Sequence, residues 1–179
     1  MDFFIAFEKA ACRSDNPEGA TRMRRRLARE LALQCLYQIE MNDVSAEAAI
    51  DHVLEEARTE DEAKLTQEKD QISAQYVTEL VEGTASRKSD IDVLLSDYLK
   101  GWQMDRLSKV DRQILRLAAY EMIYRDDVPP KVVVNEAIEM AKHFGTEESG
   151  KFVNGVLGKM IKDVEAIRGR VQSGGPAQP

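Results

Sequence analysis

The sequence contains little of what several protein classes require. Its two cysteines, Cys12 and Cys35, cannot form a disulfide framework and show no metal-ligand spacing. Aromatic residues make up 6% of the chain, with ten glycines and five prolines, which favours helices over a β-sandwich. No apolar run approaches the roughly 18 residues that span a bilayer, and the first residues lack the pattern of a secretory signal. We therefore expect no membrane attachment and a cytoplasmic location, where thiols stay reduced.

The charge of the chain is unevenly distributed. The net charge is −7, which taken alone would disfavour nucleic acid. However, residues 43–97 hold 15 acids and 5 bases, whereas residues 22–29 hold five arginines and no acid. Because the local field decides what a patch attracts, the arginine segment remains a candidate site for an anionic partner.

Apolar residues account for 43% of the chain and recur at helical spacing. They predict seven helices, at about 21–40, 45–58, 71–86, 89–98, 105–125, 130–144 and from 147 onward, and no strand. Residues 59–70 are a loop or an exposed helical extension. The predicted fold class is all-α, a compact bundle. We expect a flexible extension over residues 1–21, one helical domain over 22–165, and a disordered tail over 166–179.

The segment Val128–Met160, VPPKVVVNEAIEMAKHFGTEESGKFVNGVLGKM, predicts two consecutive helices. Two prolines open the first, and Gly145 is expected to end it in a left-handed conformation. Thr146 or Ser149 caps the second. The interior of that second helix contains weak helix formers, Asn154, Gly155 and Gly158. We interpret the glycines as positions of close helix packing.

Three segments carry a more specific signal: RRRLARELALQCLYQIE (Arg24–Glu40), SKVDRQILRLAAYEMIYRDDVPPKVVVNEAIEMAKHFG (Ser108–Gly145) and KFVNGVLGKM (Lys151–Met160). In this order they resemble the NusB family of bacterial transcription antitermination factors. The resemblance implies two helical subdomains of three to four helices each. It also implies binding of single-stranded boxA RNA together with the ribosomal protein NusE. The implied setting is an antitermination complex with RNA polymerase on ribosomal RNA genes.

Two segments are candidates for RNA contact. Arginine offers a planar fork of donors to phosphate and stacks on bases, and the first candidate set is Arg22, Arg24, Arg25, Arg26 and Arg29. The resemblance places a second set beside it, comprising Glu148, Lys151, Phe152 and Asn154. Lys151 would meet phosphate, whereas Phe152 would either stack on a base or belong to the core. Asn154 would bind RNA or cap a helix, and Glu148 would hold RNA affinity down by repulsion.

The resemblance implies that the protein partner binds elsewhere, through Tyr37, Asp105 and Asp111. Acids suit a basic ribosomal protein. The alternatives are that Asp105 is a helix cap, that Asp111 is merely solvated, and that Tyr37 is a core residue.

The sequence offers no support for catalysis. His52 and His143 have no metal-ligand pattern, and the apolar stripe containing Cys35 predicts a buried, inert thiol. We expect a protein that is not an enzyme and that uses neither a cofactor nor a metal. Two rival hypotheses stay open: a helical protein–protein scaffold, as a homodimer or with an acidic partner, and an accessory domain of an RNA-modifying enzyme.

Overall fold

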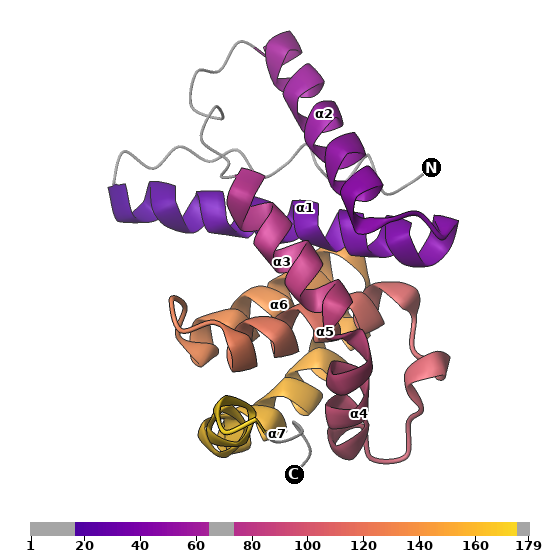
Figure 1. Cartoon of the computed structure of the whole chain (residues 1–179), viewed down its shortest axis with the longest axis vertical. Coiled ribbons are helices and arrows are strands. Elements are labelled where there is room, and N and C mark those ends of the chain that lie inside the picture. The colour runs from indigo at the N-terminus through magenta and orange to yellow at the C-terminus, as the bar shows by residue number, and fades with distance from the viewer. Residues whose placement is uncertain (1–16, 65–73, 175–179) are drawn as a thin grey trace. The chain divides into compact units, whose positions relative to one another are not determined.

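The computed structural model describes residues 17–64 and 74–174, which form seven α-helices and no strand (Figure 1). The helices are α1 (Pro17–Asn42), α2 (Ala46–Lys64), α3 (Ala74–Ser86), α4 (Lys88–Tyr98), α5 (Lys109–Tyr124), α6 (Pro130–Phe144) and α7 (Glu147–Gln172), with a short 3-10 helix, η2 (Met104–Arg106). The predicted all-α class is confirmed. Within the described ranges, no helix has the length and apolar character needed to cross a membrane.

Contacts divide the chain into two compact units, residues 1–81 and 82–179, with the boundary inside α3. In the first unit, α1 packs against α2, and Figure 1 shows α2 turning back from the end of α1. Asp43 makes this turn with φ 52°, a left-handed conformation that aspartate tolerates. Ser45 then caps α2, its Oγ accepting from the Ala48 N–H at 3.2 Å. The apolar stripes that predicted these helices form the interior, with Leu33, Cys35 and Val53 at most 1% exposed.

The second unit is built around α5, which packs against α4, α6 and α7. Every residue of α5 from 113 to 123 is buried, as expected for a helix that is covered on all sides. An ion pair ties α4 to this central helix: the Arg116 guanidinium meets Asp92 through two bonds, Nε to Oδ1 at 2.7 Å and Nη2 to Oδ2 at 2.8 Å. The middle of α5 is therefore tied to α4.

Several predicted helix ends were wrong, each for a local reason. The cap of α5 is Ser108, not Asp105, because Ser108 Oγ accepts from the Asp111 N–H at 3.1 Å while Asp105 lies in η2. Helix α4 begins at Lys88, one residue before the predicted start, and its N-cap Arg87 makes no side-chain capping bond, so neither Ser89 nor Asp90, the residues at the predicted start, caps the helix. Helix α2 continues through Lys64, which makes the first part of 59–70 a helical extension; residues 65–73 lie outside the described ranges.

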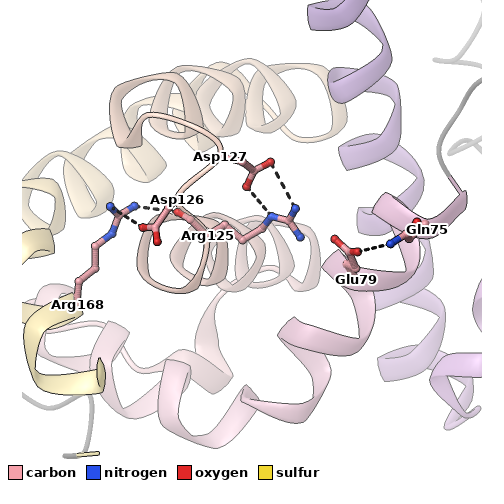
Figure 2. A network of polar contacts seen from close by, with 6 residues as sticks. All are labelled: Gln75, Glu79, Arg125, Asp126, Asp127 and Arg168. Carbon is pink, nitrogen blue, oxygen red and sulfur yellow. Dashed lines mark hydrogen bonds and ion pairs between the residues drawn. The ribbon is translucent and has the colours of Figure 1, made fainter. Parts of the chain in front are cut away.

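The outer ends of the helical part also differ from prediction. Helix α1 begins at Pro17 and not near Thr21, so Thr21 lies inside it. Helix α7 continues to Gln172, which corrects the predicted disordered tail from residue 166. Arg168 explains this extension, because its Nε donates to the Met122 carbonyl at 2.7 Å and its Nη2 to the Arg125 carbonyl at 2.9 Å. Figure 2 shows Arg168 reaching toward Asp126, with Nη1 3.3 Å from Asp126 Oδ1.

Gly145 does end α6, but not by a left-handed turn. Its φ is −114°, a value open to any residue. The constraint is space, because a Cβ on Gly145 would lie 2.6 Å from Ser149 Oγ and 2.8 Å from the Ala141 carbonyl oxygen. Thr146 follows at once as the cap of α7, accepting from the Ser149 N–H at 3.2 Å. The close approach of the two helices therefore requires glycine at this position.

Candidate nucleic-acid interface

The arginine segment lies in the second to fourth turns of α1, because that helix begins at Pro17. A cation near the N-terminus of a helix is repelled by the helix dipole, and this repulsion falls off after the first turn. Because α1 begins at Pro17 and not near Thr21, the arginines lie beyond its first turn and destabilise the helix less than the predicted start implied. Arg22 and Arg24 are exposed, and Arg25 and Arg26 are half-buried. The Arg26 guanidinium lies 3.3 Å from Glu30 Oε1. Among the described residues, Arg24 forms no ion pair, which leaves its charge available to an anion.

Arg29 does not share this surface. It is 2% exposed and has a polar partner within the chain. The reason lies in the helical repeat, since Arg29 stands three and four residues before Ala32 and Leu33, both fully buried. The accessible part of the segment is therefore made of the other four arginines.

The second candidate set lies in the first turns of α7. Lys151 is 72% exposed, and its Nζ lies 2.9 Å from Glu148 Oε1. The hydrogen bond and the charge of Glu148 raise the pKa of Lys151. Asn154 is exposed and Phe152 half-buried, so Phe152 is neither a full core residue nor a free one. Its ring meets Trp102 edge to face, with 6.1 Å between ring centroids.

The predicted partner residues belong to both compact units. Tyr37 is half-buried on α1, in the first unit, whereas Asp105 and Asp111 belong to the second. Asp105 is exposed in η2. Asp111 is not simply solvated, because its Oδ2 accepts a hydrogen bond from Ser149 Oγ at 3.2 Å. Asp111, predicted for the partner, is therefore bonded to the residue next to Glu148, which is predicted for the RNA surface.

The glycines of α7 also differ from their interpretation as packing positions. A Cβ added at Gly155 would meet no atom within 4 Å, and one at Gly158 would only touch Asn154 Oδ1 at 3.7 Å. Gly155 is exposed. Close packing within this chain therefore does not explain the weak helix formers that follow Phe152.

Two features bear on catalysis in the described residues: the state of the Cys35 thiol and the placement of possible metal ligands. Burial raises the pKa of the Cys35 thiol to about 12, and Cys35 Sγ donates to the Ala49 carbonyl at 3.7 Å between α1 and α2. The thiol is therefore protonated and inert at neutral pH, as predicted; Cys12 lies outside the described ranges. In the part of the chain that the structure describes, no group of three or more His, Cys, Asp or Glu residues is placed to hold a metal ion.

Sequence reasoning missed Trp102 as a candidate. It is 60% exposed and lies between the helices predicted over 89–98 and 105–125. The sequence did offer a signal for Trp102. It is a single tryptophan between two predicted helices in a chain with few aromatic residues, whereas a core residue would fall on the apolar stripe of a helix. The structure brings this tryptophan to Phe152, 50 positions along the chain.

Comparison with known proteins places this geometry in a family. The model of the NusB family matches residues 26–162. The chain belongs to the NusB family. It is 43% identical over 143 residues to the transcription antitermination protein NusB of Bacillus subtilis strain 168, covering 80% of this chain and 98% of that protein. The protein of the same name from Listeria monocytogenes serovar 1/2a is 46% identical over 141 residues, covering 79% and 98%.

Solved structures agree with the NusB assignment. NusB of T. maritima is 37% identical, with a TM-score of 0.66 over 78% of this chain and 91% of that one. A chain from a crystal structure of antitermination factors NusB and NusE in complex with double-stranded RNA is 28% identical, with a TM-score of 0.66 over 78% and 97%. The predicted family is thereby confirmed, and with it the assignment to a family of antitermination factors and not of enzymes.

Proposed function

We propose that this chain is a transcription antitermination factor that binds single-stranded boxA RNA together with the ribosomal protein NusE. It would act in a complex with RNA polymerase and support transcription of ribosomal RNA genes. The observation that carries the proposal is the arginine segment of α1, which presents Arg22 and Arg24 to solvent within a chain of net charge −7. Membership of the NusB family supports the same conclusion.

The arginines supply attraction rather than sequence recognition. Phosphate contacts position a nucleic acid without reading its sequence, so preference for boxA must come from contacts to bases. Lys151, Phe152 and Asn154 on α7 are our candidates for such contacts, because a cation, an aromatic ring and an amide lie within four consecutive residues there. In a plot of log affinity against log salt concentration, each phosphate of a single strand that an arginine neutralises should make the slope more negative by roughly 0.7.

For the protein partner we propose contacts from Asp105 and Asp111 in the second unit and from Tyr37 in the first. Asp105 is exposed and suits a basic partner through steering of the encounter. The solved complex of NusB and NusE with RNA supports a partner of this kind. Because Asp111 is bonded to Ser149, its role would combine partner contact with positioning of the start of α7.

Fluorescence anisotropy with labelled boxA RNA tests the proposal, with a scrambled RNA beside it and with and without NusE. Arg24→Glu should weaken binding and reduce the salt slope. Arg58→Glu is its matched control, since Arg58 is also an exposed arginine of the first unit, 70% exposed on α2, and the charge change is the same. Equal losses of RNA affinity in the two variants would show that the arginine segment acts only through the overall charge of the protein and is not a specific binding site.

The same measurement separates the rival hypotheses. A helical scaffold would not prefer boxA over the scrambled RNA, with or without NusE. An accessory domain of an RNA-modifying enzyme would copurify with a separate catalytic chain. The proposed antitermination role would be supported if the protein binds boxA more tightly than the scrambled RNA, if NusE increases this preference, and if no catalytic chain copurifies.

A further inference from the structure

Trp102 is the sole tryptophan of the chain and stands on a loop that is held at both ends. The loop leaves α4 at Leu99, 2% exposed, and returns through Leu107, 8% exposed. Between them, the backbone N–H of Trp102 donates to the Leu99 carbonyl at 3.2 Å, and Gly101 makes the turn with φ 85°. The indole nevertheless remains 60% exposed. Burial in the core of this chain therefore does not account for a tryptophan at this position.

The exposed indole is joined to α7 by its contact with Phe152. The ring planes are inclined by 65°, with centroids 6.1 Å apart, an arrangement that the quadrupoles of two aromatic rings favour. Phe152 follows Lys151, which is 72% exposed. The loop and the first turns of α7 thus present two aromatic rings and a lysine on one unit of the protein.

We propose that Trp102 and Phe152 form a base-stacking platform, on which an unpaired base of single-stranded RNA stacks against the Trp102 indole. The inference rests on the proposed RNA-binding function. It adds a residue that would distinguish single-stranded RNA from a duplex, in which the bases are already paired and stacked. Proteins that bind single strands combine aromatic platforms with cations that follow the backbone. The loop carries two exposed cations, Lys100 and Arg106, against one acid, Asp105. Because Phe152 and Lys151 belong to the segment of α7 proposed for RNA, the platform would continue that surface, and Asp105 remains assigned to the protein partner.

Stacking makes a contribution that differs in kind from that of the arginines. Phosphate contacts release counterions and weaken as salt rises, whereas stacking on a neutral indole releases none. Removing the indole should therefore lower RNA affinity by the same factor at low and high salt. The arginine variants should instead change the salt slope.

The first test uses affinity, measured by anisotropy with labelled single-stranded boxA RNA over a range of salt. Trp102→Leu keeps an apolar side chain but removes the π-face, and should weaken binding by about five- to one-hundred-fold with an unchanged salt slope. Trp102→Phe should restore most of the affinity. Val93→Ala, at another exposed apolar residue of the same unit (44% exposed), is the control and should bind like wild type. Circular dichroism establishes that each variant is folded.

The second test uses the fluorescence of Trp102 in the unmodified protein. Single-stranded boxA RNA should quench its emission and shield it from acrylamide, whereas a duplex of the same sequence should do neither. RNA binding with unaltered Trp102 emission and unaltered affinity of Trp102→Leu would overturn the platform and leave the proposed function standing. Loss of NusE binding without loss of RNA binding would instead make Trp102 a protein contact and overturn the inference. Failure of the wild-type protein to bind RNA at all would remove both.

Discussion

Ser149 donates a hydrogen bond to Asp111 across 3.2 Å, from Oγ to Oδ2, and so joins the first turn of α7 to the first turn of α5. Each helix start is separately capped, by Ser108 and Thr146. The bond therefore does not complete either helix but fixes one against the other. It connects a residue proposed for partner binding to the segment proposed for RNA binding.

We expect the Asp111–Ser149 bond to contribute to the stability of the fold. Asp111→Ala and Ser149→Ala should each lower the free energy of unfolding, with a coupling energy of about 1 kcal/mol between them. Urea unfolding of the two single variants and the double variant measures this energy. Asp105→Ala, at an exposed acid nearby, should change stability by less than about 0.5 kcal/mol. Fully additive effects would show that the bond carries no coupling.

The same pair separates the two proposed roles of Asp111 in binding NusE. Asp111→Lys changes surface charge and breaks the bond, whereas Ser149→Ala breaks the bond and keeps the charge. If only the charge contacts the partner, calorimetry should show weaker NusE binding for Asp111→Lys alone. Equal losses for both variants would assign Asp111 a positioning role.

Arg168 should be a principal support of the C-terminal turns of α7. Its side chain is 14% exposed and donates to the carbonyls of Met122 and Arg125 at the C-terminal end of α5. Figure 2 shows its ion pair with Asp126. Arg168→Ala leaves these acceptors without that donor and should cost about 2 kcal/mol of stability. Arg170→Ala is the control, because Arg170 Nε donates only along its own helix, to Ala166 at 3.3 Å. Thermal unfolding compares the two, and equal melting temperatures would contradict the proposed support.

Two helical glycines should respond in opposite directions to alanine. Gly155→Ala meets open space and should stabilise the protein by about 0.5–1 kcal/mol through better helix propensity. Gly83→Ala would place its Cβ 2.1 Å from Tyr120 Cζ. Tyr120 is 8% exposed and stacked on Tyr124, so it cannot move aside freely, and we expect a loss of about 1–3 kcal/mol. Denaturant unfolding measures both; a destabilised Gly155→Ala would reinstate the interpretation of close packing.

Glu148→Gln should tighten RNA binding severalfold. Glu148 is 81% exposed and forms an ion pair with Lys151, so the change both removes an acid that repels phosphate and releases the lysine. Glu139→Gln provides a matched control, since Glu139 forms an exposed pair of the same spacing with Lys142 at 3.5 Å. Anisotropy at fixed salt should show tighter binding for Glu148→Gln alone. Unchanged or weaker binding would remove Glu148 from the RNA surface.

Local sequence patterns were sufficient for the helices and for the family. Apolar spacing placed α6 at its observed bounds, because side chains three and four apart must share a face whatever they pack against. The same regularity made Cys35 a predictable buried residue. Caps were harder to predict, since several neighbouring residues at α4 and α5 offered equally suitable side chains and only backbone geometry selected among them.

The sequence by itself determined an all-helical chain with a cationic segment, because periodicity and charge are properties of neighbouring residues. Tertiary structure alone decided that Arg29 is buried, that Asp111 is bonded to Ser149, and that Trp102 meets Phe152. Each of these depends on how residues distant in the chain, or a whole helix face, are packed. The length of α7 was also decided by tertiary structure, because the carbonyls that accept from Arg168 lie more than 40 residues away, at the C-terminal end of α5.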